Sequence, residues 1–226
     1  MTNNEEAKKR VVDFLLAEYN ELNGEVNRLR DEGMKRLNFF ITMTTSVLGG
    51  LAILSGWRTI STYQFHLIAI VALLFLLIVG WGTFRFSIYR DIDIDFQIRS
   101  IARIRRYFIN LDPSIHTFLS EGKDDDEPTR YITGENVSTF RTTTHTIISL
   151  FFSATIGLVV NMFLDNVLTS IVIGLVGFPL VFFVIDNYIK SMFKKALENA
   201  KKSMQFPKNQ KLSLPTGKKG KKTNAS

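Results

Sequence analysis

The sequence predicts an all-α membrane protein with four transmembrane helices, paired into two hairpins, and a cytosolic helical module. Two observations support this fold class. Four blocks of 19 or 20 residues contain no charged side chain, and about 20 residues of helix cross the ~30 Å hydrocarbon core of a bilayer. Lysine and arginine, in contrast, gather in segments outside these blocks. The four uncharged blocks are Leu37–Gly56, His66–Phe84, His145–Leu164 and Val167–Ile185.

The basic residues also predict the orientation of the chain. Residues 1–36 contain seven Lys and Arg, residues 85–144 contain nine, and the segment after Ile185 contains eleven. The connections at 57–65 and 165–166 contain one in total. Cytosolic segments near membrane spans are enriched in Lys and Arg. We therefore expect a multi-pass protein of the cell inner (cytoplasmic) membrane, with both termini and the middle connection in the cytosol.

These patterns divide the chain into five predicted segments. They are a cytosolic, coiled-coil-like amphipathic helix (1–36), a first transmembrane hairpin (37–84), a cytosolic helical loop (85–144), a second transmembrane hairpin (145–186), and a basic, mostly disordered cytosolic tail (187–226).

The first segment is predicted to form one amphipathic helix. Its apolar residues recur at intervals of three and four, which is the spacing of a coiled-coil seam. The seam consists of Val12, Leu15, Tyr19, Leu22, Val26 and Leu29. It either packs on helices of its own chain or pairs with a second copy. Gly33 is a candidate bend between the seam and the first span.

The second span is predicted to continue as a helix to about Asn110, because proline disfavours helical geometry in the residue before it. Asp112 is expected to cap a short helix that starts at Pro113 and runs through Leu119. The acidic segment 121–130 is expected to be a solvated loop, followed by a new helix from about Glu135.

The apolar face of the helix after the second span needs a partner, and the seam is the expected one. This face consists of Ile94, Ile98, Ile101, Ile104, Phe108 and Leu111. Four arginines interleave with it and are candidate contacts of the cytosolic module or of lipid headgroups. They are Arg99, Arg103, Arg105 and Arg106, and we expect them to face water, the acidic N-terminal helix or the membrane surface.

Two short motifs resemble those of a widespread group of small, uncharacterised prokaryotic four-span membrane proteins. The first is Glu-Tyr-x-x-Leu in the N-terminal helix, and the second is Arg-Ile-Arg-x-Tyr followed by Asp-Pro after the second span. The matching residues are Glu18, Tyr19, Leu22, Arg103, Ile104, Arg105, Tyr107, Asp112 and Pro113. Asn23 departs from the group, where a basic residue is expected. The resemblance covers about residues 10–190 and implies the architecture but no activity.

Candidate metal and catalytic residues are few. Asp91, Asp93 and Asp95 lack the shaped loop that calcium needs, and we expect a solvated helix face with an Asp95–Arg99 pair. His66, His116 and His145 stand alone without the paired spacing of zinc ligands. Phosphate-binding loops, dinucleotide fingerprints and nucleophile elbows do not occur in the sequence. We therefore expect no enzyme activity, no metal and no cofactor.

The spans carry hydroxyl and small residues, with no ionisable side chain before Asp186 except histidine at two block ends. Proton-coupled carriers usually hold a carboxylate in mid-membrane, so a carrier is not favoured. Small residues allow close helix packing, and weakly polar ones can instead line a narrow pore. The candidate pore-lining residues are Thr42, Thr44, Thr45 and Ser46.

The C-terminal tail holds the excess charge, because residues 187–226 sum to +10 whereas the whole chain is +7. Lysines near an anionic leaflet contribute roughly 1 kcal/mol each, so contact with anionic lipid is expected. Aromatic residues for base stacking are missing from Lys208 onward, and specific nucleic-acid binding is not expected.

The leading hypothesis is a non-enzymatic, oligomeric membrane protein that self-associates through the seam and acts as a scaffold, sensor partner or effector. The first alternative is an oligomeric ion channel. The second alternative, ranked last, is a membrane-bound enzyme acting on lipid, for which His116, His145 and Asp91 are the candidate residues.

Overall fold

The computed structural model describes residues 3–57, 59–119, 124–125, 139–164 and 166–205. In these ranges the chain is helical and has no strand. The elements are α1 (Asn3–Ser55), α2 (Thr62–Leu111), the short 3-10 helix η1 (Pro113–Phe118), α3 (Thr139–Leu164) and α4 (Val167–Ser203). All four α-helices are long and apolar enough to cross a membrane. The predicted all-α class with four candidate spans is confirmed.

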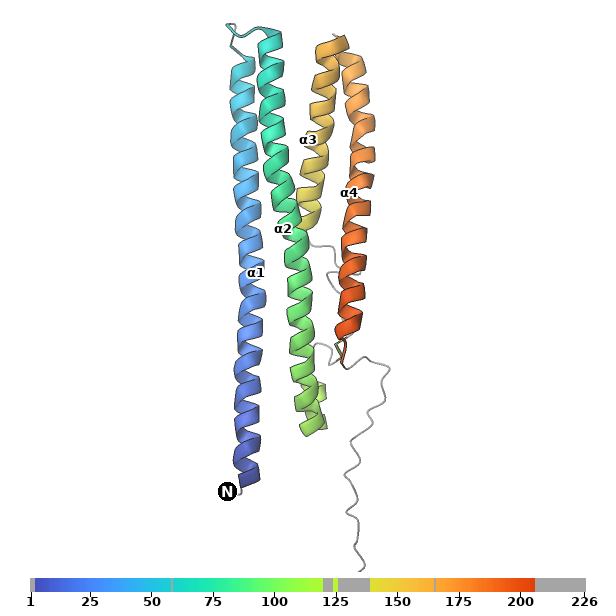
Figure 1. Ribbon diagram of the computed structural model, residues 1–226. Helices are drawn as coiled ribbons and strands as arrows, with labels where there is room; N and C mark the ends of the chain where they lie inside the picture. The colour runs from blue at the N-terminus through green and yellow to red at the C-terminus, as the bar shows by residue number, and fades with distance from the viewer. Residues whose placement is uncertain (1–2, 58, 120–123, 126–138, 165, 206–226) are drawn as a thin grey trace, which may run out of the picture.

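Three of the helices are much longer than a membrane crossing requires. At 1.5 Å per residue, the 53 residues of α1 and the 50 residues of α2 extend about 80 and 75 Å. The free ends of α1, α2 and α4 project toward the same end of the molecule, and the two short interhelical connections lie at the other (Figure 1). We call the end toward which α1, α2 and α4 project the polar end. It comprises residues 3–36, 85–119, 124–125, 139–144 and 187–205.

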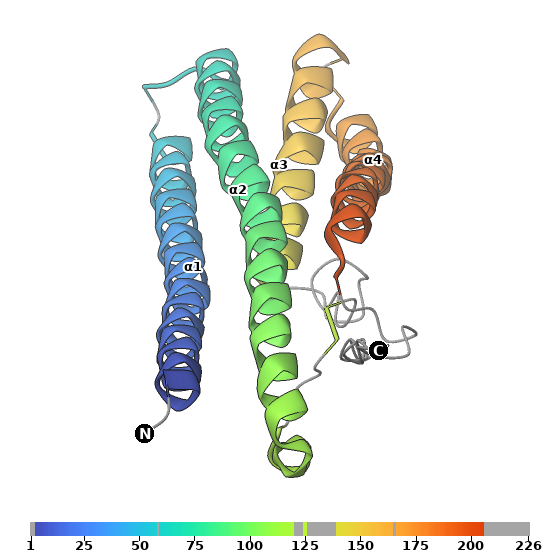
Figure 2. The ribbon, with the colours of Figure 1, turned by 60° about the horizontal axis from the view of Figure 1, so that its bottom comes forward.

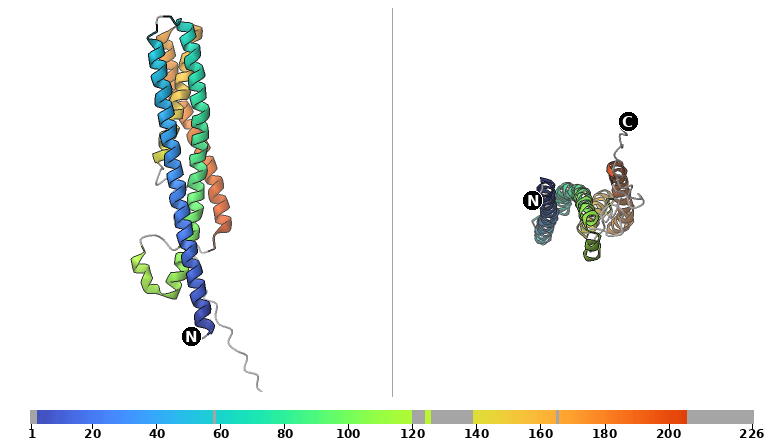
Figure 3. Two further views of the ribbon diagram at one scale, coloured as in Figure 1. Left: turned by 90° about the vertical axis from the view of Figure 1, so that its left-hand side faces the viewer. Right: turned by 90° about the horizontal axis from the view of Figure 1, so that it is seen from below.

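The four helices form an open row instead of a closed bundle (Figure 2). Each helix packs mainly on its neighbour in the chain, from α1 through α2 and α3 to α4. In the described part of the chain, α1 and α4 make no contact with each other. The view along the helices shows α1 at one edge of the row (Figure 3). The face of α1 that points away from α2 is therefore uncovered.

Small residues bring the spanning segments close together. A Cβ atom at Gly80 would lie 2.9 Å from a ring carbon of Phe40 and 3.0 Å from Ile148. Between α3 and α4, a Cβ atom at Gly157 would lie 3.1 Å from the backbone oxygen of Ser170. The Ser153 hydroxyl donates a hydrogen bond to the carbonyl of Gly174. These contacts confirm that small residues of the third and fourth spans allow close packing.

At the polar end, the seam packs on α2 of the same chain. Val26 and Leu29 form one buried apolar cluster with Ile94 and Ile101. Tyr19, Leu22 and Ile98 are packed against that cluster. The predicted partner is therefore observed within a single chain for Ile94, Ile98 and Ile101, the first three residues of the apolar face of α2. Nearer the N-terminus, Val11, Phe14 and Leu16 remain exposed.

Several local predictions are confirmed. Helix α2 runs without interruption to Leu111. Asp112 caps η1, and its carboxylate accepts a hydrogen bond from the Ser114 backbone at 2.9 Å. The start expected near Glu135 lies outside the described residues.

Two expectations about helix limits were wrong. Gly33 does not bend α1, because the helix is continuous from Asn3 to Ser55. Helix α4 continues to Ser203, well into the segment expected to be mostly disordered. The continuation has a physical reason, because Ile189 and Phe193 are buried in the core cluster around Phe84.

Candidate functional site

The polar end contains a set of buried charged residues, which we call the ionic junction. Within it, the side chains of Asp91 and Asp95 are 0% and 1% exposed, and that of Arg99 is 3% exposed. The expected solvated acidic face is therefore wrong for Asp91 and Asp95, which share the expected helix face but point inward. Asp93 lies on the surface.

The first part of the junction joins α2 to α3, α4 and α1. Asp91 accepts from Arg90 at 2.7 Å and from Arg141 of α3 at 3.3 Å. The Arg141 guanidinium lies 4.6 Å from the ring centroid of Phe193 of α4. The Arg90 side chain fills the space above Gly33, where a Cβ atom would lie 1.8 Å from its Nη1. Gly33 is therefore a close-contact glycine rather than a bend.

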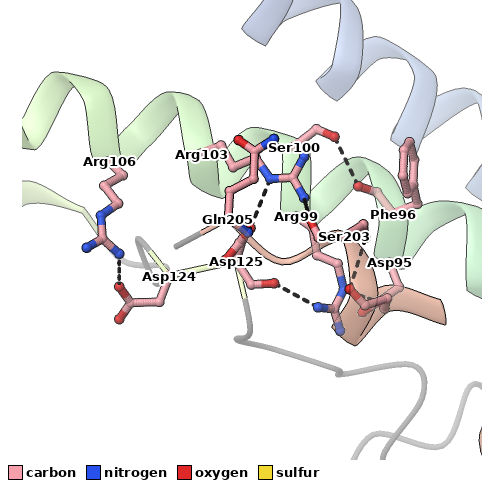
Figure 4. Close-up of polar contacts among 11 residues, drawn as sticks. Asp95, Phe96, Arg99, Ser100, Arg103, Arg106, Asp124, Asp125, Ser203 and Gln205 are labelled. Carbon is pink, nitrogen blue, oxygen red and sulfur yellow. Dashed lines mark hydrogen bonds and ion pairs between the residues drawn. The ribbon is translucent and has the colours of Figure 1, made fainter. Parts of the chain in front are cut away.

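The second part joins α2 to residues 124–125 and to the end of α4 (Figure 4). Arg99 donates through Nε to Asp95 at 2.7 Å and through Nη1 to the Asp125 carbonyl at 2.7 Å. The Asp125 carboxylate accepts from Arg103 Nε at 3.0 Å and from the backbone N–H of Gln205 at 2.7 Å. Arg103 Nη2 also donates to the Ser203 carbonyl at 2.8 Å. Asp125 therefore ties three separate segments together.

The arginines of α2 do not behave as one group. Arg99 and Arg106 are buried, and Arg106 donates to Asp124 at 2.9 Å. Arg105 instead points toward the N-terminal helix, with its guanidinium 5.8 Å from the ring of Tyr19. The expectation that these arginines face water, lipid headgroups or the N-terminal helix is wrong for Arg99 and Arg106.

The acidic partners correct a second expectation. Asp124 and Asp125 are 8% and 0% exposed, so this part of the predicted solvated loop is interior. The neighbouring residues 121–123 and 126–130 lie outside the described ranges. Burying a carboxylate among arginines costs less free energy than burying an unpaired carboxylate, because each charge keeps a charge-assisted hydrogen bond.

Burial sets the electrostatics of the junction. Removal from water raises the pKa of Asp91 above its usual range, although Arg90 and Arg141 act in the opposite direction. Burial likewise raises the pKa of Asp95, against the hydrogen bond from Arg99. For both carboxylates, the free-energy cost of desolvating the charged form therefore exceeds the stabilisation of that form by the neighbouring arginines.

A pocket of about 360 Å³ adjoins the junction between α2 and α4. Its polar lining includes Asp95, Arg99, Lys195 and Asn199. Asp95 Oδ1 and Arg99 Nη2 are buried and have no hydrogen-bond partner among the described residues.

The candidate pore-lining residues divide between two environments. Thr42, Thr45 and Ser46 are exposed on α1. Thr44 is 8% exposed and lies in the interior of its own chain. A lumen between copies cannot be lined by a side chain that one chain encloses, so Thr44 does not belong to this set. Thr42 accepts, through its carbonyl, hydrogen bonds from the hydroxyls of Thr45 and Ser46.

The histidines do not form a site. His145 Nε2 lies 3.2 Å from the Phe182 carbonyl, and its ring stacks on that of Phe182. His66 lies near Asn161, and His116 lies on η1 beyond the far end of α2. About 30 Å of helix separates Asp91 from the end of α2. His116, His145 and Asp91 are therefore not brought together, and the described ranges hold no group of three His, Asp or Glu that could hold a metal.

The sequence does contain a signal for the ionic junction. Asp91, Asp95, Arg99, Arg103 and Arg106 follow each other at intervals of four, four, four and three. This spacing places oppositely charged residues along one helix face. Their partners on other segments show no comparable spacing in the sequence. These partners are Arg141, Asp124 and Asp125.

No family model, curated protein or solved structure matches the chain. The resemblance to the group of small prokaryotic membrane proteins therefore stays a prediction.

Proposed function

We propose that this protein is a non-enzymatic, self-associating scaffold or sensor partner of the inner membrane, with the polar end as its cytosolic module. The ionic junction is the observation that carries this proposal. Helices α1, α2 and α4 continue unbroken from the apolar segments into the polar end. Ion pairs fix α2 to Arg141 of α3 and to Asp125. Hydrogen bonds from Arg103 to the Ser203 carbonyl and from the Gln205 backbone to Asp125 fix the end of α4. A module held in this way moves together with the spans. This coupling suits a protein that transmits a change in the membrane-spanning helices to the cytosol or presents a fixed surface to a partner.

The exposed edge of the row supports self-association. Along α1, the exposed residues include Thr42, Thr45, Ser46, Gly49 and Gly50. A Cβ atom at either glycine would meet nothing within 4 Å. In lipid, small and hydroxyl residues allow helices to approach closely and to exchange hydrogen bonds. Four of the six seam residues, Tyr19, Leu22, Val26 and Leu29, are already packed on α2. We therefore propose this face, in place of the seam, as the contact between copies.

Cysteine cross-linking tests this contact directly, because the native chain has no cysteine. Thr45→Cys is expected to form a disulfide-linked dimer in oxidised membranes. Ile78→Cys is the control, since its side chain is 73% exposed on α2 but lies away from α1's small-residue face. Equal cross-linking of both variants, or of neither, would contradict the proposed contact.

Labelling of single cysteines also tests the orientation. A membrane-impermeant maleimide applied to intact cells is expected to leave Ser203→Cys unlabelled and to label Ser61→Cys at the α1–α2 connection. The reverse pattern would place the polar end outside the cytosol and remove the cytosolic module from the proposal.

An ion channel is the second candidate, supported by the exposed hydroxyls of α1. In an oligomer these hydroxyls would form weakly polar walls, as a narrow pore requires. Thr45→Trp is expected to abolish ion flux in reconstituted vesicles, whereas Thr59→Trp near the α1–α2 connection is expected to leave it unchanged. Vesicles that conduct no ions with the unaltered protein would exclude the channel.

A further inference from the structure

A groove runs between α2 and α4 in the half of the spanning region that borders the polar end. Helix α3 packs on both helices, whereas α2 and α4 make few contacts with each other. The groove has a volume of about 830 Å³ and is lined by apolar residues, with Ile148 and Phe152 of α3 as its floor. A second pocket of about 220 Å³ continues it along α3 to Val160.

The length of the groove matches one leaflet. From Ile148 to Val160, α3 rises about 18 Å, and half of the ~30 Å hydrocarbon core is about 15 Å. A transmembrane helix from another protein would cross both leaflets and would extend well beyond this groove. A chain that ends in mid-membrane fits its length better, and that is the shape of a lipid acyl chain.

The open end of the groove changes from apolar to polar at a defined level. Trp81 and Tyr188 line it there, with ring centroids 5.6 Å apart. Arg85 follows Trp81 by one helical turn on the same face of α2, directly after the uncharged block. Aromatic rings of this kind sit at headgroup level. The groove therefore ends where the phosphates of a leaflet begin.

Arg85 supplies a cation at this level. Its Nη2 lies 3.4 Å from the Tyr89 hydroxyl, and it forms no ion pair with a carboxylate in the described ranges. On α4, the carboxylate of Asp186 is already paired with Lys190 at 2.6 Å. The mouth therefore keeps one unneutralised guanidinium, with the Tyr89 hydroxyl beside it, and both groups suit a phosphate.

We propose that the groove binds one glycerophospholipid, with an acyl chain between α2 and α4 and its phosphate on Arg85. The acyl chain covers the apolar floor of the groove, which α2 and α4 leave open. The guanidinium and the Tyr89 hydroxyl supply the hydrogen-bond donors for the phosphate oxygens.

Native mass spectrometry of the delipidated protein, titrated with palmitoyl-oleoyl phosphatidylglycerol in detergent, tests this site. One tightly held lipid per chain is expected, with about tenfold weaker binding in Arg85→Gln, the effect of one charge-assisted hydrogen bond. Arg85→Lys should recover part of the binding. Arg36→Gln is the matched control, because Arg36 flanks the first span at the same level but rests on Phe86.

A second pair of variants tests the acyl chain. Val184→Trp fills the groove and is expected to abolish tight binding, whereas Leu175→Trp lies on α4 outside the described pockets and should not. Equal effects of Arg85→Gln and Arg36→Gln would overturn the proposal, as would tight binding of a diacylglycerol with the same chains. If Val184→Trp changed the oligomeric mass but not the lipid count, the groove would belong to a second copy and the proposal would fail. Monodisperse elution and an unchanged helical circular dichroism spectrum establish that each variant is folded.

Discussion

Replacing Asp125 with alanine should release the end of α4 from α2. The carboxylate is fully buried and holds Arg103 and the backbone N–H of Gln205 at the same oxygen. Breaking a buried ion pair by removing one partner costs about 3–5 kcal/mol. Arg103 is 25% exposed, so water partly replaces the carboxylate, and we expect the lower end of that range, about 3 kcal/mol.

Hydrogen–deuterium exchange of the protein in lipid nanodiscs measures this release locally. Because 1.4 kcal/mol corresponds to a factor of ten, a loss of about 3 kcal/mol lowers the protection of the last turns of α4 by roughly a hundredfold. Asp125→Asn retains one side-chain acceptor and should lie between Asp125→Ala and the native chain. Amides of the α3–α4 interface near Gly157 should keep their protection.

Asp93→Ala is the matched control, since it removes an exposed carboxylate from α2 at the same end of the molecule. It should leave exchange in α4 unchanged. The reasoning is refuted if Asp125→Ala and Asp93→Ala give the same protection of α4. A double-mutant cycle with Arg103→Ala should recover a coupling of about 1–3 kcal/mol, and additive effects would remove the ion pair from the explanation.

Three further predictions concern other buried contacts of the protein. Gly33→Ala should destabilise the protein by about 1–3 kcal/mol, because the new methyl group displaces the Arg90 side chain. Gly24→Ala should stabilise the protein by about 0.5–1 kcal/mol, because a Cβ atom there meets nothing within 4 Å. Thermal unfolding of both variants in detergent tests this difference. Gly157→Val should separate α3 from α4 and lower the midpoint of the same transition, and an unchanged midpoint would contradict the close packing. Because burial raises the pKa of Asp95, the folded chain binds more protons than the unfolded chain between the usual carboxyl pKa and the raised one, so this group's contribution to stability falls as pH rises through that window. Asp95→Asn should therefore weaken the gain in stability that accompanies mild acidification, and an identical pH profile would refute the shift.

The spans and the pairing of α1 with α2 could be predicted from the sequence, because the spans depend on the length of uncharged blocks and the pairing depends on apolar periodicity. The uncharged blocks have the length of a membrane crossing, and the seam residues Val26 and Leu29 recur at the interval that meets Ile94 and Ile101. Likewise, Asp112 before Pro113 is a local signal that requires no tertiary information. These features lie within one segment or repeat along it.

The ionic junction could be predicted only in part. The spacing of Asp95 and Arg99 gave their pairing, but a charged helix face is usually solvated, and nothing in α2 alone indicates that it is covered. What covers it lies elsewhere in the chain, on Asp125, Arg141 and the end of α4. Gly33 shows the same limit. Its role depends on the side chain of Arg90, from a different helix, and glycine in a helix otherwise suggests a bend.

The mass of the protein component, measured by light scattering of the complex purified in mild detergent, tests the proposed scaffold most directly. One chain has a mass of 25.8 kDa. We predict a mass of two or more chains for the native protein, and fewer chains per complex when bulky residues replace Thr45 and Gly49 on the open edge of α1. A native mass of a single chain would contradict self-association and would leave the open row of helices to be covered by lipid alone.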